Sequence, residues 1–131
     1  MPIVALYAAL LALLFVVLSL RTIGARRRLQ VAVGDGGHRE LQRAMRVHAN
    51  FAEYAPLALL LIYLVEVASG PSGLVHALGL GLLAGRSVHA YGVSQAKEDL
   101  RFRVSGMALT LMVLIVASLY LLYRHASGLL A

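Results

Sequence analysis

The chain has 131 residues, of which 60% are hydrophobic, and it carries a net charge of +6 with a mean hydropathy of +0.81. A composition this apolar is typical of an integral membrane protein and predicts a single domain over residues 1–131. The absence of cysteine excludes disulfides, thiolate metal sites and dithiol redox chemistry on the protein itself. The basic residues are clustered with few aromatic neighbours, which favours membrane-flanking loops and argues against a nucleic-acid partner.

Four apolar stretches follow one another along the chain, each long enough to cross a lipid bilayer as a helix. We expect an all-α membrane protein, a four-transmembrane-helix bundle, with spans at about 2–24, 38–68, 74–96 and 104–123. The first stretch resembles a signal peptide only loosely, because its basic residues follow the apolar run, so we expect it to be retained. The third is rich in small residues, and the spacing of Gly81 and Gly85 favours close helix packing in lipid.

The charged connections are distributed unevenly. Six arginines lie from Arg26 to Arg46, between the first two spans, and Lys97, Arg101 and Arg103 lie between the last two. The connection between the second and third spans has no Lys or Arg. The positive-inside rule therefore places both basic connections in the cytoplasm and, for a bacterial inner membrane, both termini in the periplasm.

A polar stripe marks the start of the second span. Read as a helix, Arg43, Arg46, Asn50, Glu53 and Leu57 lie on one face. Polar groups that enter a membrane need partners inside the protein or around a ligand. Two interpretations remain open, a structural network that holds helices in register and a site for a charged, peptide-like ligand. The excess of arginines over carboxylates favours an anionic ligand.

Other chemistry receives less support from the sequence. His48 faces off the stripe and suits a packing role, and no His/Glu cluster has the spacing of a metal site. No serine is placed beside a base with an orienting acid, which excludes a nucleophilic triad. A thiol that belongs to a ligand is easier to accommodate, because a nearby guanidinium lowers the pKa of a thiol by stabilising the thiolate.

Several motifs together resemble the MAPEG family, the membrane-associated proteins of eicosanoid and glutathione metabolism. The segment Arg46-x-His48-x-Asn50-x-x-Glu53-Tyr54-x-Pro56 is similar to the second-helix signature of that family, which includes microsomal glutathione transferases. Three weaker matches are the end of the first helix, the third-helix motif and an arginine just ahead of the fourth helix. They are carried by Arg26-Arg27-Arg28, by Gly85-Arg86-x-x-His89 and by Arg103.

The resemblance implies a homotrimer that binds glutathione, as co-substrate, between neighbouring subunits near the cytosolic face. It assigns the peptide portions of glutathione to Arg46, Asn50 and Glu53. It lets Tyr54 line the site, Arg26 or Arg27 reach it from the first helix, and His89 contact the ligand with Arg86 as support. The resemblance also assigns the stabilisation of the thiolate to Arg103, with Arg101 as the second choice for that role.

The expected function is that of a glutathione-dependent transferase or peroxidase, acting on lipophilic electrophiles or lipid hydroperoxides. Val93 and Met107 stand where family enzymes often have tyrosines, which weakens the expectation of catalysis more than that of the fold. Two alternatives are a non-enzymatic binding or scaffold protein on the same fold and a small multidrug transporter. Such transporters carry a carboxylate in the first span, and residues 3–18 here have none.

Overall fold

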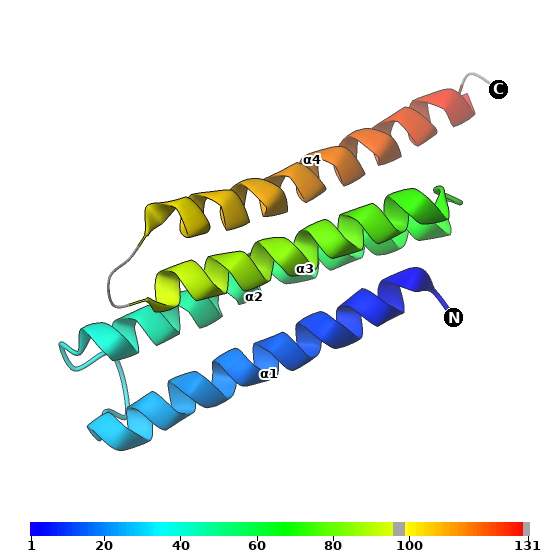
Figure 1. Ribbon diagram of the computed structural model, residues 1–131. Coiled ribbons are helices and arrows are strands. Elements are labelled where there is room, and N and C mark those ends of the chain that lie inside the picture. The colour runs from blue at the N-terminus through cyan, green and yellow to red at the C-terminus, as the bar shows by residue number, and fades with distance from the viewer. Residues whose placement is uncertain (96–98, 130–131) are drawn as a thin grey trace.

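The computed structural model describes residues 1–95 and 99–129. Helices account for nearly all of them: α1 (Ile3–Leu29), α2 (Arg39–Val67), α3 (Ser72–Ser94) and α4 (Leu100–Leu129). Within these residues there is no strand, so the prediction of an all-α fold is confirmed. The helices alternate in direction, and Figure 1 shows the start of α1 and the end of α4 at one end of the bundle, and the end of α1 and the starts of α2 and α4, which carry most of the arginines, at the other.

The helix ends differ from the expected spans on the arginine side. α1 continues past Gly24 to Leu29, because arginine is a good helix former and its charge is favourable in the last turn of a helix. The helix then ends at Gln30, which adopts a left-handed conformation with φ 56°. α4 begins at Leu100 rather than Val104. α3 ends at Ser94; the expected end at residue 96 and the basic residue at position 97 lie outside the described residues.

Three of the helices, α1, α2 and α4, are long and apolar enough to cross a membrane. Their outward faces carry large apolar side chains such as Leu13, Leu60 and Leu122, which suit contact with lipid. α3 is less apolar, because it contains Arg86, His89 and several glycines. It nevertheless contacts all three other helices, and the side chains of Arg86 and His89 are buried. The protein is an integral membrane protein built as a four-helix bundle.

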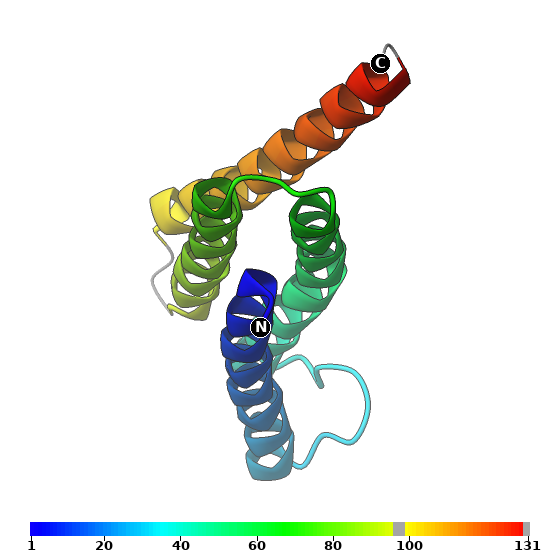
Figure 2. The same cartoon turned by 90° about the vertical axis from the view of Figure 1, so that its right-hand side faces the viewer.

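Glycines set the distance between α3 and α4. A Cβ atom placed on Gly106 of α4 would lie 2.5 Å from the backbone nitrogen of His89, and one placed on Gly85 would lie 3.0 Å from the carbonyl oxygen of Gly106. The two backbones therefore touch at this crossing, as the small residues of the third span predict. Figure 2 shows α4 diverging from the other helices toward its C-terminus, and residues 122–128 are exposed. Among the described residues, α4 does not contact α1.

The end of the bundle that holds the termini is closed by side chains from three helices. Glu66 of α2 accepts hydrogen bonds from the backbone N–H groups of Ile3 (2.5 Å) and Val4 (3.0 Å), which are otherwise unsatisfied at the start of α1. One turn further along α1, the hydroxyl of Tyr7 lies 2.8 Å from Nδ1 of His76 on α3. These contacts hold α1 against α2 and α3 at the end opposite the basic connections.

Candidate functional site

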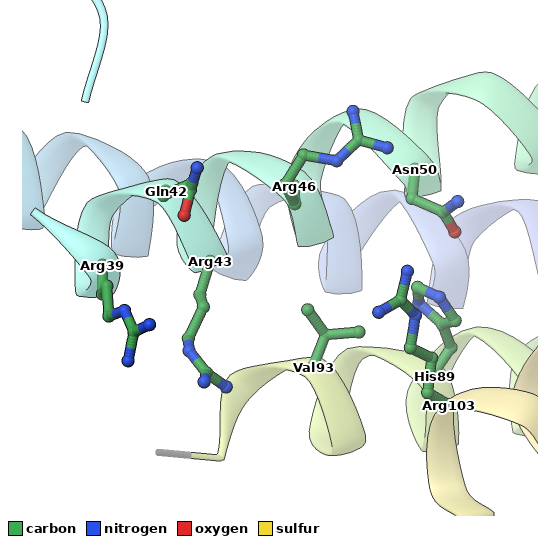
Figure 3. A pocket seen from close by; sticks show the side chains of 8 residues that line it. All are labelled: Arg39, Gln42, Arg43, Arg46, Asn50, His89, Val93 and Arg103. Carbon is green, nitrogen blue, oxygen red and sulfur yellow. The ribbon is translucent and has the colours of Figure 1, made fainter. Parts of the chain in front are cut away.

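A concentration of polar side chains lies at the arginine-rich end of the bundle, where α2, α3 and α4 meet around an open cavity of about 310 Å³. α2 contributes most of its lining, as Figure 3 shows, with α3 and α4 closing the opposite side. The lining residues are Arg39, Gln42, Arg43, Arg46, Asn50, His89, Val93 and Arg103. We refer to this cavity as the arginine pocket.

The charge of the arginine pocket is positive. Four of its eight lining residues are arginines, and no carboxylate lines it within the described part of the chain. Arg43 also donates a hydrogen bond to the carbonyl oxygen of Gln95, and Arg21 of α1 donates one to Ser94 Oγ. Both cations thus lie at the C-terminal end of α3, where the helix dipole favours positive charge. A pocket with this lining is suited to a ligand that carries carboxylate, phosphate or thiolate groups.

The inner part of the pocket is formed by Asn50 and His89. Asn50 is half-buried on α2, and His89 on α3 is 5% exposed. Oδ1 of Asn50 accepts a hydrogen bond of 2.7 Å from Nη1 of Arg86. The polar stripe of α2 therefore continues from the exposed arginines to a group that is tied into the interior of the bundle.

Arg86 is the most deeply buried charged residue among those described, with 1% of its surface exposed. Its Nε donates to Thr110 Oγ1 at 2.9 Å, and its guanidinium carbon lies 5.7 Å from the centroid of the Tyr54 ring. A weaker contact joins Nη2 to the sulfur of Met107 at 3.5 Å. Arg86 thus links α3 to both α2 and α4 and does not itself line the pocket.

The structure brings together four of the residues that the sequence predicted for the site, namely Arg46, Asn50, His89 and Arg103. Other predicted residues lie elsewhere in the isolated chain. Glu53 is exposed on α2, and Tyr54 lies beside Arg86 rather than in the pocket. Arg101 is exposed at the start of α4, where its backbone N–H donates to Asp99 Oδ1.

Arg26 and Arg27 line a separate open cavity together with Gln30, Val31 and Ala32. Arg26 donates to the carbonyl oxygens of Val31 (3.4 Å), Ala32 (3.2 Å) and Gly34 (3.0 Å), so its guanidinium organises the loop between α1 and α2. Three glycines of that loop have positive φ, which explains the high glycine content of the segment. Within this chain, these two arginines do not reach the arginine pocket.

Sequence reasoning missed Arg39, Gln42 and Val93 as lining residues. The signal was present for the first two, because extending the helical period of the stripe back by one turn from Arg43 and Arg46 reaches positions 39 and 42. Val93 lies one turn after His89 and was noted only as a missing tyrosine.

The packing role expected of His48 is confirmed. Its ring stacks on Phe15 of α1 with ring centroids 4.6 Å apart, and its Nε2 lies 3.1 Å from Ser19 Oγ. His48 therefore fixes α1 against α2 on the side of α2 turned away from the pocket. Across the described residues, no three His, Asp or Glu side chains gather as a metal site requires.

Comparisons with known proteins identify the family. The model of the MAPEG family matches residues 4–123. The inner membrane protein YecN of Escherichia coli strain K12 is 41% identical over 119 residues, which cover 88% of this chain and 89% of YecN. The protein of the same name from Escherichia coli O6:H1 is 41% identical over the same length. The match extends over all four helices of the membrane bundle, and the chain therefore belongs to the MAPEG family.

Proposed function

We propose that the protein is a glutathione-dependent transferase or peroxidase of the inner membrane, which acts on lipophilic electrophiles or lipid hydroperoxides. The observation that carries the proposal is the arginine pocket, which combines four guanidinium groups with Asn50 and His89. Glutathione presents two carboxylates, an ammonium group, two peptide bonds and a thiol. Arg39, Arg43 and Arg46 are suited to the carboxylates, and Asn50 to a peptide group.

Arg103 is the residue proposed to stabilise the thiolate of glutathione. It reaches the pocket from α4, where His89 and Asn50 form the inner wall. A free thiol has a pKa of about 8.5, and each unit by which that pKa falls requires about 1.4 kcal/mol of stabilisation of the thiolate. One guanidinium in a partly desolvated cleft is sufficient for a shift of this size. The bilayer delivers the lipophilic second substrate.

The proposal includes a homotrimer with glutathione bound between subunits. Glu53 supports it, because this carboxylate lies exposed on α2 near the beginning of the apolar part of the helix. A charged side chain that faces hydrocarbon is costly, with the cost rising to the order of 2.5–3.5 kcal/mol at mid-membrane depth. A neighbouring subunit that covers this face removes that cost. In the proposed trimer, Glu53 holds the ammonium group of glutathione, and Arg26 or Arg27 of one subunit approaches the pocket of the next.

The proposed orientation places the arginine pocket on the cytoplasmic side and both termini in the periplasm. The pocket and the arginine-rich ends of α1, α2 and α4 occupy the same end of the bundle, so the positive-inside rule applies to the site as well as to these helix ends. The name of the relative YecN, an inner membrane protein, supports the inner membrane as the location of the protein. Cytoplasmic glutathione then reaches the pocket without crossing the membrane.

The first test is glutathione binding to the detergent-purified protein, measured by calorimetry, with Arg46→Ala in parallel. We expect binding in the micromolar to low-millimolar range, lost in the variant because one carboxylate of the ligand loses its partner. Arg124→Ala is the matched control, since it removes an exposed arginine near the other end of α4. Equal loss of binding in both variants would attribute the effect to overall charge and count against the site.

The second test concerns catalysis. Arg103→Ala should reduce turnover of a lipophilic electrophile or a lipid hydroperoxide far more than it reduces glutathione binding. Equal loss of the two would remove Arg103 from the catalytic role. The same assay with both substrate types separates a transferase from a peroxidase.

A second candidate function is a non-enzymatic binding or scaffold protein on the same fold. The network around Arg86 favours it, because Asn50 is engaged by a buried side chain and contributes to helix packing whether or not a ligand is present. In that case the protein shows no detectable binding at millimolar glutathione, and Asn50→Ala alters only its stability.

A further inference from the structure

The orientation of the Asn50 amide is determined by its neighbour. Arg86 Nη1 lies 2.7 Å from Asn50 Oδ1, and an arginine side chain carries only hydrogen-bond donors. The oxygen of the amide must therefore face Arg86, and the NH₂ group is directed to another side. Because Asn50 also lines the arginine pocket, its NH₂ group is the polar atom left for a ligand there.

We propose that Arg86 is a positioning residue that holds Asn50 with its NH₂ group toward the pocket, so that this position selects a hydrogen-bond acceptor of the ligand, a carboxylate or a peptide carbonyl oxygen. The inference rests on the proposed function, since it concerns the ligand groups that the same pocket takes. Arg86 acts through Asn50 and does not contact the ligand.

The guanidinium of Arg86 is fixed from several directions. Nε donates to Thr110 Oγ1, which in turn donates to the carbonyl oxygen of Gly106 at 3.0 Å. The ring of Tyr54 lies beside the guanidinium, with 5.7 Å between the guanidinium carbon and the ring centroid. With 1% of its surface exposed, Arg86 cannot turn away to release the amide. The donor character of Asn50 is thus built into the packing of α2, α3 and α4.

The positive charge of Arg86 supports the same inference. Among the residues that the structure describes, no carboxylate forms an ion pair with this guanidinium. A buried charge without an opposite charge nearby is costly, and an anion beyond Asn50 partly offsets that cost. Occupancy of the pocket and the packing of the three helices around Arg86 are therefore coupled.

The test is the near-isosteric change Asn50→Asp, which replaces the NH₂ group by a second oxygen. One carboxylate oxygen then accepts from Arg86 as an ion pair, and the other presents negative charge to the pocket. We expect the Tm in detergent to rise and the Kd for glutathione to increase at least tenfold. If Asn50 only held the helices together, its substitution would not raise the Tm while weakening glutathione binding.

Thr22→Val is the matched control, because it removes a hydrogen bond between α1 and α2, from Thr22 Oγ1 to the carbonyl oxygen of Ala44, and leaves Arg86, Asn50 and the pocket lining unchanged. We expect a lower Tm with the Kd for glutathione kept within about threefold of the unmodified protein. Unchanged affinity in Asn50→Asp would overturn the inference, and so would a fall in its Tm.

A separate measurement distinguishes failure of this inference from failure of the proposed glutathione-dependent function. If the unmodified protein does not bind glutathione, the rise in Tm caused by low-millimolar sulfate, relative to chloride at the same ionic strength, serves as the probe of the pocket. A rise that is present in the unmodified protein and lost in Asn50→Asp supports the role of Arg86 even without a glutathione site. An equal rise in both proteins, or a rise in neither, overturns it.

Discussion

The crossing of α3 and α4 depends on Gly106, and its replacement by alanine is the sharpest test of how the site is held. The added methyl group would lie 2.5 Å from the nitrogen of His89 and 2.6 Å from the carbonyl oxygen of Gly85, both backbone atoms that cannot swing aside. To reach an ordinary contact of 3.4 Å, the two helices must separate locally by about 0.9 Å. Overpacking of this kind typically costs about 1–3 kcal/mol, which lowers the folding equilibrium constant roughly 5- to 150-fold.

The assay is unfolding of the detergent-solubilised protein by a denaturing detergent, followed by circular dichroism, with glutathione binding measured on the same samples. Binding should weaken as well, because Arg103 lies one helical turn before Gly106 and moves with it. Gly24→Ala is the control, since nothing lies within 4 Å of its added methyl group. Alanine inside a helix should raise stability there by about 0.5–1 kcal/mol. If Gly106→Ala is as stable as the unmodified protein, or if Gly24→Ala loses as much, the close approach of α3 and α4 is not what positions the site.

Three further outcomes follow from other contacts. Glu66→Gln keeps a hydrogen-bond acceptor at the start of α1 but removes its negative charge, so the free energy of unfolding should fall by about 0.3–1 kcal/mol in the same assay. Gly79→Ala places a methyl group 2.3 Å from the Tyr7 ring, so the hydrogen bond to His76 should break and stability should fall by about 1–3 kcal/mol. Glu53→Gln should reduce the fraction of cross-linked trimer in detergent, and an unchanged fraction would place Glu53 outside the proposed subunit interface.

The fold could be predicted because its determinants are local in the sequence. Four apolar runs separated by charged or glycine-rich segments specify four helices, and the helical period brings Arg43, Arg46 and Asn50 onto one face. The structure places all three in one pocket with His89 and Arg103. Residues of α2 could be grouped from spacing alone, since a single helix fixes their relative positions.

The roles of Arg86 and Arg26 could not be predicted from spacing, because each depends on a neighbour that is distant in the sequence or on the path of a loop. Arg86 meets Asn50, 36 residues away, and Thr110, 24 residues away, only after three helices have packed. Arg26 binds the carbonyl oxygens of a loop whose conformation depends on glycines with positive φ. In the proposed trimer, the surroundings of Glu53 depend on contacts between subunits, which lie outside the geometry of one chain.

The cap on α1 has a consequence for how the protein enters the membrane. As α1 leaves the ribosome, the N–H groups of Ile3 and Val4 lack partners, and the carboxylate that satisfies them arrives only with Glu66, 63 residues after Ile3. An unsatisfied amide and an unpaired carboxylate are each unfavourable near the hydrocarbon boundary. When the Glu66 carboxylate accepts hydrogen bonds from these N–H groups, the amides and the carboxylate all have partners. The hairpin of α1 and α2 is the smallest unit in which these groups have partners within the protein, so this contact can form only after translation has passed Glu66.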